Sequence, residues 1–228
     1  MTTGTDLAKR FFTNNGATYD RIANLSTLGL DILWKRKILA KIPPGSTCIL
    51  DQACGTGVLT FKIARRFPGA RVIGVELCGE YLDIARAKAR ALGITNCEFR
   101  LGRAEDIVVD APVDAITSSY LAKYAELDRL VANAKMMLRP GGVLVMHELT
   151  RPVSPVYAAL WQFDFQFIRA CIAWRYPEWD MPLRELQPLV KESRWQDELA
   201  AALAANSFSR ITTDVLFIQS SALVCAVK

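Results

Sequence analysis

The sequence predicts an α/β protein with a doubly wound, Rossmann-like, mostly parallel sheet of about seven strands that ends in an antiparallel hairpin. From residue 46 onward, short apolar runs alternate with helical patterns, and this alternation is typical of βαβ units with right-handed crossovers. The last two apolar runs, 211–218 and 222–227, are joined by a short polar turn, so we expect them to pair antiparallel. A length of 228 residues suits one large domain.

Each element before the long connection has its own signal. Apolar runs that stop at turn or acidic residues predict strands at 47–51, 71–76, 97–101, 113–119 and 143–146. Apolar residues at helical spacing, followed by Pro or Gly, predict helices at 58–67, 79–92 and 125–138. A further helix is expected at 183–205.

We expect residues 1–228 to form one domain. Two of its segments lie outside the alternation of strands and helices. Residues 1–43 are expected to form a helical N-terminal cap, and 151–190 an inserted lid, because the connection there is too long for an ordinary loop. The lid is rich in aromatic side chains: Tyr157, Trp161, Phe163, Phe165, Phe167, Trp174, Tyr176 and Trp179. Three interpretations stay open: a helix buried in the domain or between the subunits of a homodimer, a pocket wall for a prenylated or aromatic substrate, or peripheral membrane contact.

Composition and charge exclude several classes of protein. The 28 Lys and Arg against 23 Asp and Glu are spread along the chain, so no nucleic-acid partner is expected. No secretory signal is visible, and polar residues interrupt the apolar stretch 156–174, which argues against a spanning helix. Six cysteines without a C-x-x-C pair, and a single His, predict free thiols, no metal and a cytoplasmic protein.

The segment Asp51–Gly57 carries the functional signal. A strand ends in an acid, and the chain then turns through Gly55 and Gly57 into a helix. Glycines are needed where the backbone turns tightly and passes close to a ligand. Glu76 ends the next strand, 19 residues after Gly57, where a carboxylate can accept hydrogen bonds from ribose hydroxyls.

Three classes of ligand could bind at this loop, and the alternative is that its glycines serve packing alone. No Lys follows the glycines, so a phosphate-binding P-loop is excluded. A dinucleotide site has a third small residue where Thr60 stands, and it has no use for Asp51. An acid there suits a cationic ligand, and S-adenosylmethionine (SAM) carries an ammonium and a sulfonium.

This loop resembles the first motif of class I SAM-dependent methyltransferases, D/E-x-G-x-G-x-G, with Ala53 at the first glycine. Residues 18–36 are similar to the N-terminal region of the ubiquinone/menaquinone biosynthesis C-methyltransferases. Their motifs D-x-A-G-G-T-G, L-K-P-G-G, E-F-S-K-P and L-T-x-G-I-V-A-L-H resemble residues 51–57, 138–142, 148–152 and 216–228. Two departures stand out: Ala122-Lys123-Tyr124 replaces L-R-N, and the lid lacks a tyrosine-rich segment.

The resemblance implies SAM as cofactor and a set of residues that bind it. Thr56 and Glu76 should contact SAM, Arg103 and Ala104 should lie along the adenine, and Ser119 near the methionine end. Arg103 stands where Asp or Asn is frequent, and Glu105 or Asp106 is the suggested substitute. The full set expected at the cofactor is Tyr19, Asp51, Ala53, Cys54, Gly55, Thr56, Gly57, Glu76, Leu77, Arg103, Ala104, Glu105, Ser118 and Ser119.

Catalysis requires the acceptor to be held in line with the methyl group, and a phenol or carbon acid also requires a base. The candidates at the sheet edge are His147, Glu148, Lys123 and Tyr124, with a structural role as the alternative for His147. We expect methyl transfer to a hydrophobic or aromatic small molecule, specifically C-methylation of a quinone precursor. The alternatives are N- or O-methylation of a lipid or small metabolite, and a non-catalytic SAM-binding scaffold.

Overall fold

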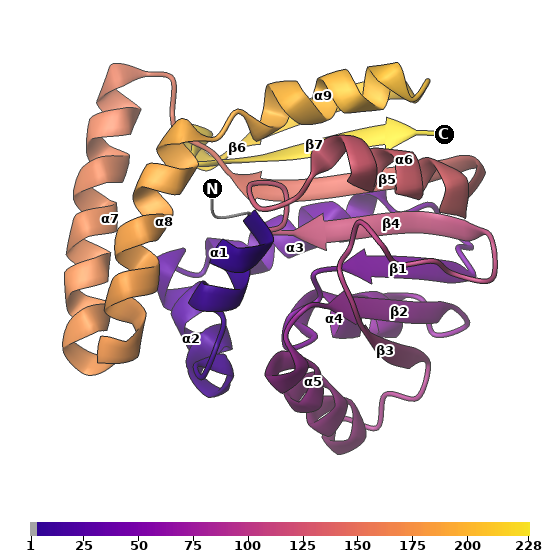
Figure 1. The fold of residues 1–228 in the computed structure, drawn as a ribbon, viewed down its shortest axis with the longest axis horizontal. Helices are drawn as coiled ribbons and strands as arrows, with labels where there is room; N and C mark the ends of the chain where they lie inside the picture. The colour runs from indigo at the N-terminus through magenta and orange to yellow at the C-terminus, as the bar shows by residue number, and fades with distance from the viewer. Residues whose placement is uncertain (1–3) are drawn as a thin grey trace.

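The computed structural model describes residues 4–228, so the first three residues of the expected cap lie outside it (Figure 1). The predicted fold class is confirmed. A seven-stranded sheet has the order β3-β2-β1-β4-β5-β7-β6, with helices around it. The parallel strands are β1 (Cys48–Gln52), β2 (Arg71–Glu76), β3 (Cys97–Leu101), β4 (Val113–Ser119) and β5 (Leu138–Leu149).

The strand order reverses between β1 and β4, which are hydrogen-bonded neighbours. From β1 the chain builds outward through β2 to β3, and it then returns to the other side of β1 for β4 and β5. In open parallel sheets, ligands bind beyond the carboxyl ends of the strands at such a reversal. Asp51 of β1 stands opposite Thr117 of β4, so the predicted loop begins at this point.

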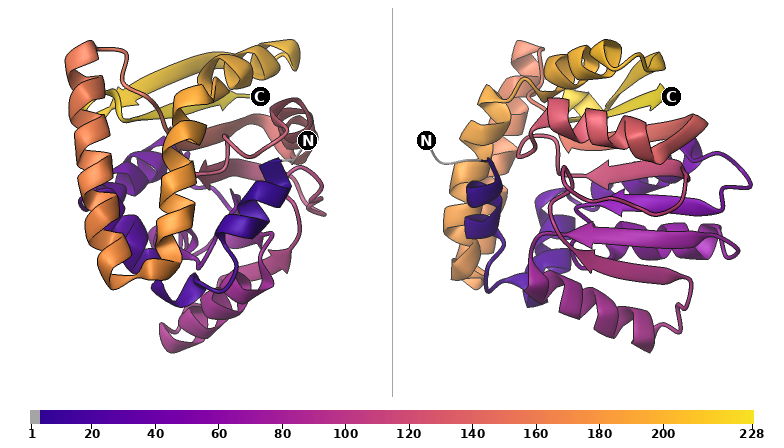
Figure 2. Two further views of the ribbon diagram at one scale, coloured as in Figure 1. Left: turned by 60° about the vertical axis from the view of Figure 1, so that its left-hand side comes forward. Right: turned by 45° about the vertical axis from the view of Figure 1, so that its right-hand side comes forward.

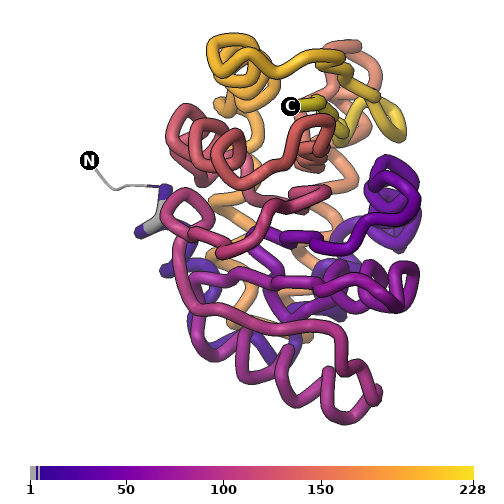
Figure 3. Tube along the Cα trace, turned by 90° about the vertical axis from the view of Figure 1, so that its right-hand side faces the viewer, coloured from indigo at the N-terminus to yellow at the C-terminus, as the bar shows by residue number. Residues whose placement is uncertain are grey.

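Helices cover both faces of the sheet, as Figure 3 shows from its end. On one face, α3 (Leu30–Lys41), α4 (Val58–Arg66) and α5 (Gly79–Ala91) bury apolar side chains such as Ile38 and Ile63. On the other face, α6 (Leu127–Met137) and α9 (Trp195–Ala205) pack around Leu130 and Leu199. Alternate residues of the strands serve the two layers, since Ile49 and Leu50 belong to different core clusters.

The C-terminal hairpin pairs antiparallel, as predicted. It consists of β6 (Ser209–Leu216), the short helix η2 (Phe217–Gln219) and β7 (Ser221–Val227), with β7 against β5. β5 is longer than the expected 143–146 because the Pro-Gly-Gly segment joins the ladder. Gly141 N–H donates to the Lys228 carbonyl at 3.1 Å, and Lys228 N–H donates to the Gly142 carbonyl at 2.9 Å.

The helix expected at 183–205 was wrong as a single element. The structure divides it into α8 (Asp180–Glu192) and α9, with a break at Ser193 and Arg194. Ser193 has an extended backbone, and its Oγ accepts the N–H of Trp195 at 3.3 Å. Ser193 is the C-cap of α8 and Arg194 the N-cap of α9, so the chain leaves the helical conformation between them.

The cap and lid helices stand beyond the carboxyl ends of the parallel strands (Figures 1 and 2). These are α1 (Gly4–Phe11), α2 (Gly16–Ser26), α7 (Pro155–Arg175), the short helix η1 (Pro177–Trp179) and α8. Ile22 of α2 packs against Ile172, Trp179 and Leu183 of the lid, which joins the two segments. None of the helices within residues 4–228 is both long and apolar enough to cross a membrane.

The two sides of α7 differ in exposure. Ile172 is buried and Ile168 packs against the cluster around α2, on the helix face that the sequence pattern indicated. Phe163, Phe167 and Trp174 are exposed. The expectations of a dimer contact or a membrane contact for this helix stay predictions.

Candidate active site

The loop after β1 presents bare backbone at the sheet edge. Ala53, Gly55 and Gly57 all have positive φ angles, of 53°, 56° and 89°. At Gly57 a Cβ atom would lie 2.5 Å from the Phe61 ring, so this position requires glycine. Cys54 N–H donates to the Val75 carbonyl at 2.9 Å, which ties the loop to β2.

Glu76 ends β2 beside this loop and holds it in place. Its Oε2 accepts the N–H of Gly55 at 3.0 Å, and its Oε1 accepts the N–H of Cys78 at 2.9 Å. Burial raises the pKa of Glu76, and the backbone N–H donors oppose this rise. The carboxylate is therefore fixed at the loop by two backbone donors.

Two cavities meet over the loop. The sheet-edge cavity encloses about 780 Å³ of space open to solvent and is lined by Glu76, Leu77, Arg103 and Ala104, among others. The polar cavity encloses about 1190 Å³ and is lined by residues of α2, α3, α4 and the loop. The residues that line both are Tyr19, Ala53, Gly55, Ser119 and Tyr120.

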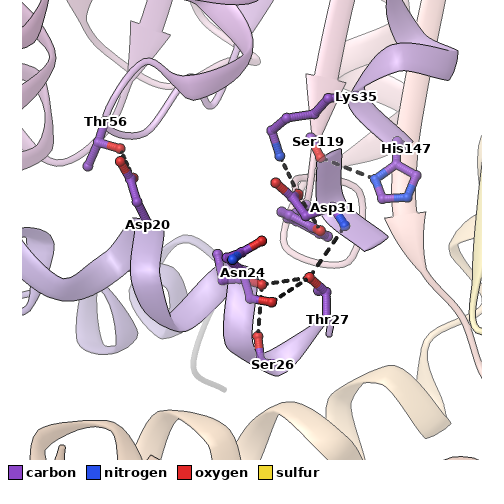
Figure 4. A network of polar contacts seen from close by, with 11 residues as sticks. Asp20, Asn24, Ser26, Thr27, Asp31, Lys35, Thr56, Ser119 and His147 are labelled. Atoms are coloured by element: carbon purple, nitrogen blue, oxygen red, sulfur yellow. Dashed lines mark hydrogen bonds and ion pairs between the residues drawn. The ribbon is translucent and has the colours of Figure 1, made fainter. Parts of the chain in front are cut away.

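Charged residues of cap helices α2 and α3 line the polar cavity, and Figure 4 shows their polar contacts. Asp20 of α2 accepts a hydrogen bond from the Thr56 hydroxyl and pairs with Lys88. Asp31 and Lys35 form an ion pair within α3. The Tyr120 hydroxyl donates to Asp31 Oδ1 at 2.7 Å. The cap is thus tied to the sheet edge by carboxylates of α2 and α3.

Asp51 lies at the base of the polar cavity. Its carboxylate accepts hydrogen bonds from Thr60 Oγ1 at 2.6 Å and Thr117 Oγ1 at 3.0 Å. Burial raises the pKa of Asp51 to about 6, and the two hydroxyl donors oppose the rise. A cation in the cavity would favour the ionised form of this buried acid.

A third, apolar cavity of about 580 Å³ lies between the cap and the lid. Its wall is formed by Phe11, Phe12, Ile22, Trp179, Leu183 and Leu186, among others. Among the described residues that line it, Lys123 alone carries a charge. Lys123 Nζ lies 2.7 Å from Glu148 Oε1 and 4.5 Å from the centre of the Tyr124 ring.

His147 is completely buried beside these cavities. Its ring lies 5.0 Å from the ring centre of Trp34 and 5.3 Å from that of Tyr120. Its Nδ1 shares a hydrogen bond of 3.1 Å with Ser119 Oγ (Figure 4). Burial, followed by the charges of Lys35 and Lys123, holds the pKa of His147 well below its usual value. The imidazole is therefore neutral at physiological pH.

Most of the residues that we expected at the cofactor line the sheet-edge or polar cavity. They are Tyr19, Asp51, Ala53, Cys54, Gly55, Thr56, Glu76, Leu77, Arg103, Ala104, Glu105 and Ser119. Within the described residues, Gly57 and Ser118 line neither cavity. Gly57 is instead the N-cap of α4, and the Ser118 side chain is buried in the sheet.

The acidic residues suggested in place of Arg103 have other partners. Arg103 donates to Glu126 Oε1 at 2.7 Å, and Glu105 Oε1 accepts the N–H of Glu126 at 3.1 Å. Asp106 pairs with Arg129 at 2.6 Å. Glu105 lines the sheet-edge cavity, whereas Asp106 is not among the described residues that line it.

The four catalytic candidates lie together but differ in access. Lys123 and Tyr124 line the apolar cavity, and Tyr124 also lines the sheet-edge cavity. Within residues 4–228, Glu148 and His147 line none of the three cavities. Glu148 reaches the apolar cavity only through its contact with Lys123.

Sequence reasoning missed several lining residues, namely Phe12, Asp20, Asp31, Lys35, Tyr81 and Tyr120. Most belong to the cap, whose docking is not encoded in any local motif. Tyr120 carried a local signal, because it directly follows Ser119 at the end of β4.

The residues at these cavities fit SAM by their charge and hydrogen-bonding groups. Glu76 and the bare loop suit a ribose, and the buried carboxylate of Asp51 suits the positive methionine end. No cluster of His, Cys, Asp and Glu within residues 4–228 has the make-up of a metal site. This fold and this site define a SAM-dependent methyltransferase.

Comparisons with known proteins place the chain within that class. Residues 49–142 match the family described as a methyltransferase domain. A demethylmenaquinone methyltransferase of Thermus thermophilus is 30% identical over 210 residues, which cover 87% of this chain and 91% of that protein. The ubiquinone/menaquinone biosynthesis C-methyltransferase UbiE of Klebsiella pneumoniae is 30% identical over 72% of this chain and 67% of its own length. The chain belongs to the methyltransferase family of these proteins.

Solved structures agree on the fold. A geranyl diphosphate C-methyltransferase of Streptomyces coelicolor, solved with Mg²⁺, geranyl diphosphate and S-adenosylhomocysteine, superposes with a TM-score of 0.61. It is 19% identical and covers 87% of this chain and 79% of its own. At this identity the likeness concerns the fold alone.

Proposed function

We propose that this methyltransferase methylates a carbon atom of an apolar aromatic acceptor, a quinone precursor, bound in the apolar cavity. The observation that carries the proposal is the meeting of three cavities at Tyr19 and Tyr120. Each of these side chains lines the two cofactor cavities and the apolar cavity. An acceptor between cap and lid would therefore lie next to the reacting end of the cofactor.

The same geometry supports a set of residues that would bind SAM. When bound, SAM supplies an electrophilic methyl group on a sulfonium. Glu76 would hold the ribose hydroxyls, Asp51 the positive methionine end, and Ala104 the adenine edge. The Tyr19 ring stands over the loop, 3.7 Å from where a Cβ of Gly55 would be, so the cap shields the cofactor from water.

The acceptor class is supported by the cavity wall and by the relatives. Rings and aliphatic side chains line the cavity, which suits an apolar body with one polar group placed at Lys123. Relatives from Thermus thermophilus and Klebsiella pneumoniae are named for the methylation of quinone precursors. Both lines of support point to an aromatic ring that carries a hydroxyl.

A second candidate is N- or O-methylation of a lipid or small metabolite. It is favoured by Lys123, which occupies the position of an Arg in the motif that this segment resembles. Lysine is a point charge and cannot bind an acceptor through two parallel hydrogen bonds as arginine does. The orientation of the acceptor at this residue would then differ from that in the quinone enzymes.

The test uses SAM with a deuterated methyl group and a set of acceptors. These are a short-chain demethylated naphthohydroquinone, the same compound with both hydroxyls blocked, and vesicles of phosphatidylethanolamine. We expect the mass label on a ring carbon of the free hydroquinone, and at least tenfold less product with Glu76→Ala when SAM is below saturation. The matched control is Lys37→Met, which changes an exposed lysine of α3. Label on nitrogen or oxygen supports the second candidate, and S-adenosylhomocysteine binding without any transfer supports a scaffold.

A further inference from the structure

A buried ion pair lies at the base of the apolar cavity. The side chains of Lys123 and Glu148 are only 2% and 0% exposed, and their charged atoms are 2.7 Å apart. Lys123 also approaches the carbonyl of Tyr120 at 3.4 Å. An ammonium has three N–H donors, so one is left for a ligand in the cavity.

Glu148 is incompletely paired. Its Oε1 accepts from Lys123 and from the N–H of Leu149, both at 2.7 Å. Its Oε2 is buried and has no hydrogen-bond partner among the described residues. Buried polar atoms without partners are rare in folded proteins and require an explanation. An oxygen that receives a proton during the reaction is such an explanation.

Aromatic rings surround this pair, and the Asp31–Lys35 ion pair lies close to it at Tyr120, whose ring centre is 5.6 Å from Lys123 Nζ and 5.2 Å from Lys35 Nζ. The Tyr124 ring centre lies 4.5 Å from the ammonium, Tyr19 of α2 lines the same cavity, and the nearby His147 is neutral. The lid side chains that line the cavity are uncharged. A buried ion pair in such a place is weak evidence for stability and stronger evidence for function.

We propose that Lys123 and Glu148 together take the proton from an acidic hydroxyl of the acceptor, a phenol or an enol, and so generate the anion that is methylated. This inference rests on the proposed function and names the class of acceptor. Lys123 passes one proton to Glu148 and receives the hydroxyl proton in its place. The acceptor oxygen keeps the electron pair of its O–H bond and becomes an anion, and Glu148 becomes a neutral acid.

The geometry explains why two residues are required. Glu148 does not line the cavity, so it reaches the acceptor only through Lys123. Burial lowers the pKa of Lys123, although the Glu148 charge opposes this effect. The lowered pKa eases the transfer of the Lys123 proton to the carboxylate. The buried site holds one positive and one negative charge before and after the transfer. No additional charge is therefore desolvated when the anion forms.

A coloured probe tests this proton relay, the transfer from the acceptor through Lys123 to Glu148, in the absence of the cofactor. The anion of 4-nitrophenol is yellow, so absorbance reports its ionisation, and calorimetry in two buffers of different ionisation enthalpy counts protons released. At a pH where the free probe is mostly colourless, we expect the ionised fraction of the probe bound to the wild-type protein to be at least tenfold higher than that of the free probe. We also expect no proton release, because Glu148 keeps the proton. 4-Nitroanisole, which lacks the hydroxyl, controls for effects of binding on absorbance.

Variants separate the two residues. Lys123→Met alone leaves a buried carboxylate unpaired and endangers the fold, so the test variant is the double change Lys123→Met with Glu148→Gln. It should fold, bind S-adenosylhomocysteine and leave the bound probe colourless. Glu148→Gln alone removes the proton acceptor, so a bound anion then releases one proton to the buffer. Lys37→Met should behave as the wild type.

Two results would overturn the relay. One is a colourless bound probe in the wild type, and the other is a yellow probe accompanied by release of one proton, which would make Lys123 a counter-ion only. Either result leaves the proposed function intact if the label still reaches the ring carbon. Absence of methyl transfer to every acceptor instead contradicts the proposed function, whatever the probe shows.

Discussion

The hydroxyl of Tyr120 donates a hydrogen bond of 2.7 Å to Asp31, which joins the end of β4 to cap helix α3. Tyr120 has a φ angle of 68°, a left-handed conformation that is costly for a residue with a side chain. Such outliers persist where the surroundings over-determine them, and they cluster at active sites. Asp31 therefore helps to hold a strained residue at the point where the three cavities meet.

Tyr120→Phe should destabilise the fold by about 2 kcal/mol, because it removes a hydrogen bond to a charged acceptor. Urea unfolding followed by circular dichroism measures this change. Hydrogen exchange should show faster exchange in α3, since the cap loses its tie to β4. Tyr157→Phe on the exposed side of α7 is the matched control and should change neither quantity. Equal stability of the two variants would mean that the Tyr120 hydroxyl does not fasten the cap.

Glu76→Ala should weaken binding of S-adenosylhomocysteine by about 10- to 100-fold. In the proposed binding mode the variant would lose one charged hydrogen bond to the ribose, worth about 1.5–3 kcal/mol, and it also frees the N–H of Gly55. Isothermal titration calorimetry gives the affinity. Glu98→Ala, which removes a carboxylate from β3 at the surface, serves as control and should bind normally. Unchanged affinity in Glu76→Ala would contradict the site.

Ala53→Gly should stabilise the protein by about 0.5 kcal/mol. Alanine at a φ of 53° costs roughly 1–2 kcal/mol, whereas glycine adopts this conformation freely but loses more entropy on folding. Ala87→Gly, at an exposed position within α5, should instead cost about 1 kcal/mol. Chemical denaturation gives the free energy of unfolding of both variants, which should rise for Ala53→Gly and fall for Ala87→Gly. A loss of stability in Ala53→Gly would mean that the alanine methyl makes packing contacts that outweigh its backbone strain.

The sequence was sufficient for the sheet and for the cofactor loop because both depend on local patterns. Apolar runs of strand length located β1 to β5, and the spacing of Asp51, Gly55 and Glu76 predicted residues that line the sheet-edge or polar cavity. The acceptor side was harder to predict, since it is formed by packing between segments far apart in the chain. Nothing in the sequence near Asp31 indicates that it accepts a hydrogen bond from Tyr120. No proline or glycine stands at Ser193 and Arg194, where 183–205 divides into two helices.

Asp51 should couple SAM binding to pH. Its pKa is about 6 in the folded protein and near 3.8 when unfolded, so between these values only the folded form holds the proton. Stability from this group is therefore present at low pH and is lost as pH rises through 6, by about 3 kcal/mol. A bound cation requires the ionised form, so SAM affinity should fall as pH drops from 7 to 5. Calorimetry measures the SAM affinity at each pH. The control is Asp51→Asn, whose SAM affinity should not show this dependence on pH.

His147 should show the opposite dependence of stability on pH. The unfolded protein protonates this residue below about pH 6.5, whereas burial keeps it neutral in the folded state. Stability from this group is therefore lost as pH falls below 6.5, by about 1.4 kcal/mol per unit at most. His147→Asn retains a hydrogen-bonding group near Ser119 but does not titrate, so its unfolding free energy between pH 7 and 5 should lack this loss. The rate of methyl transfer should keep the wild-type pH profile in this variant, because His147 lines none of the described cavities and so does not reach the acceptor. Disappearance of an acidic limb from the rate profile of His147→Asn would instead identify His147 as the proton acceptor.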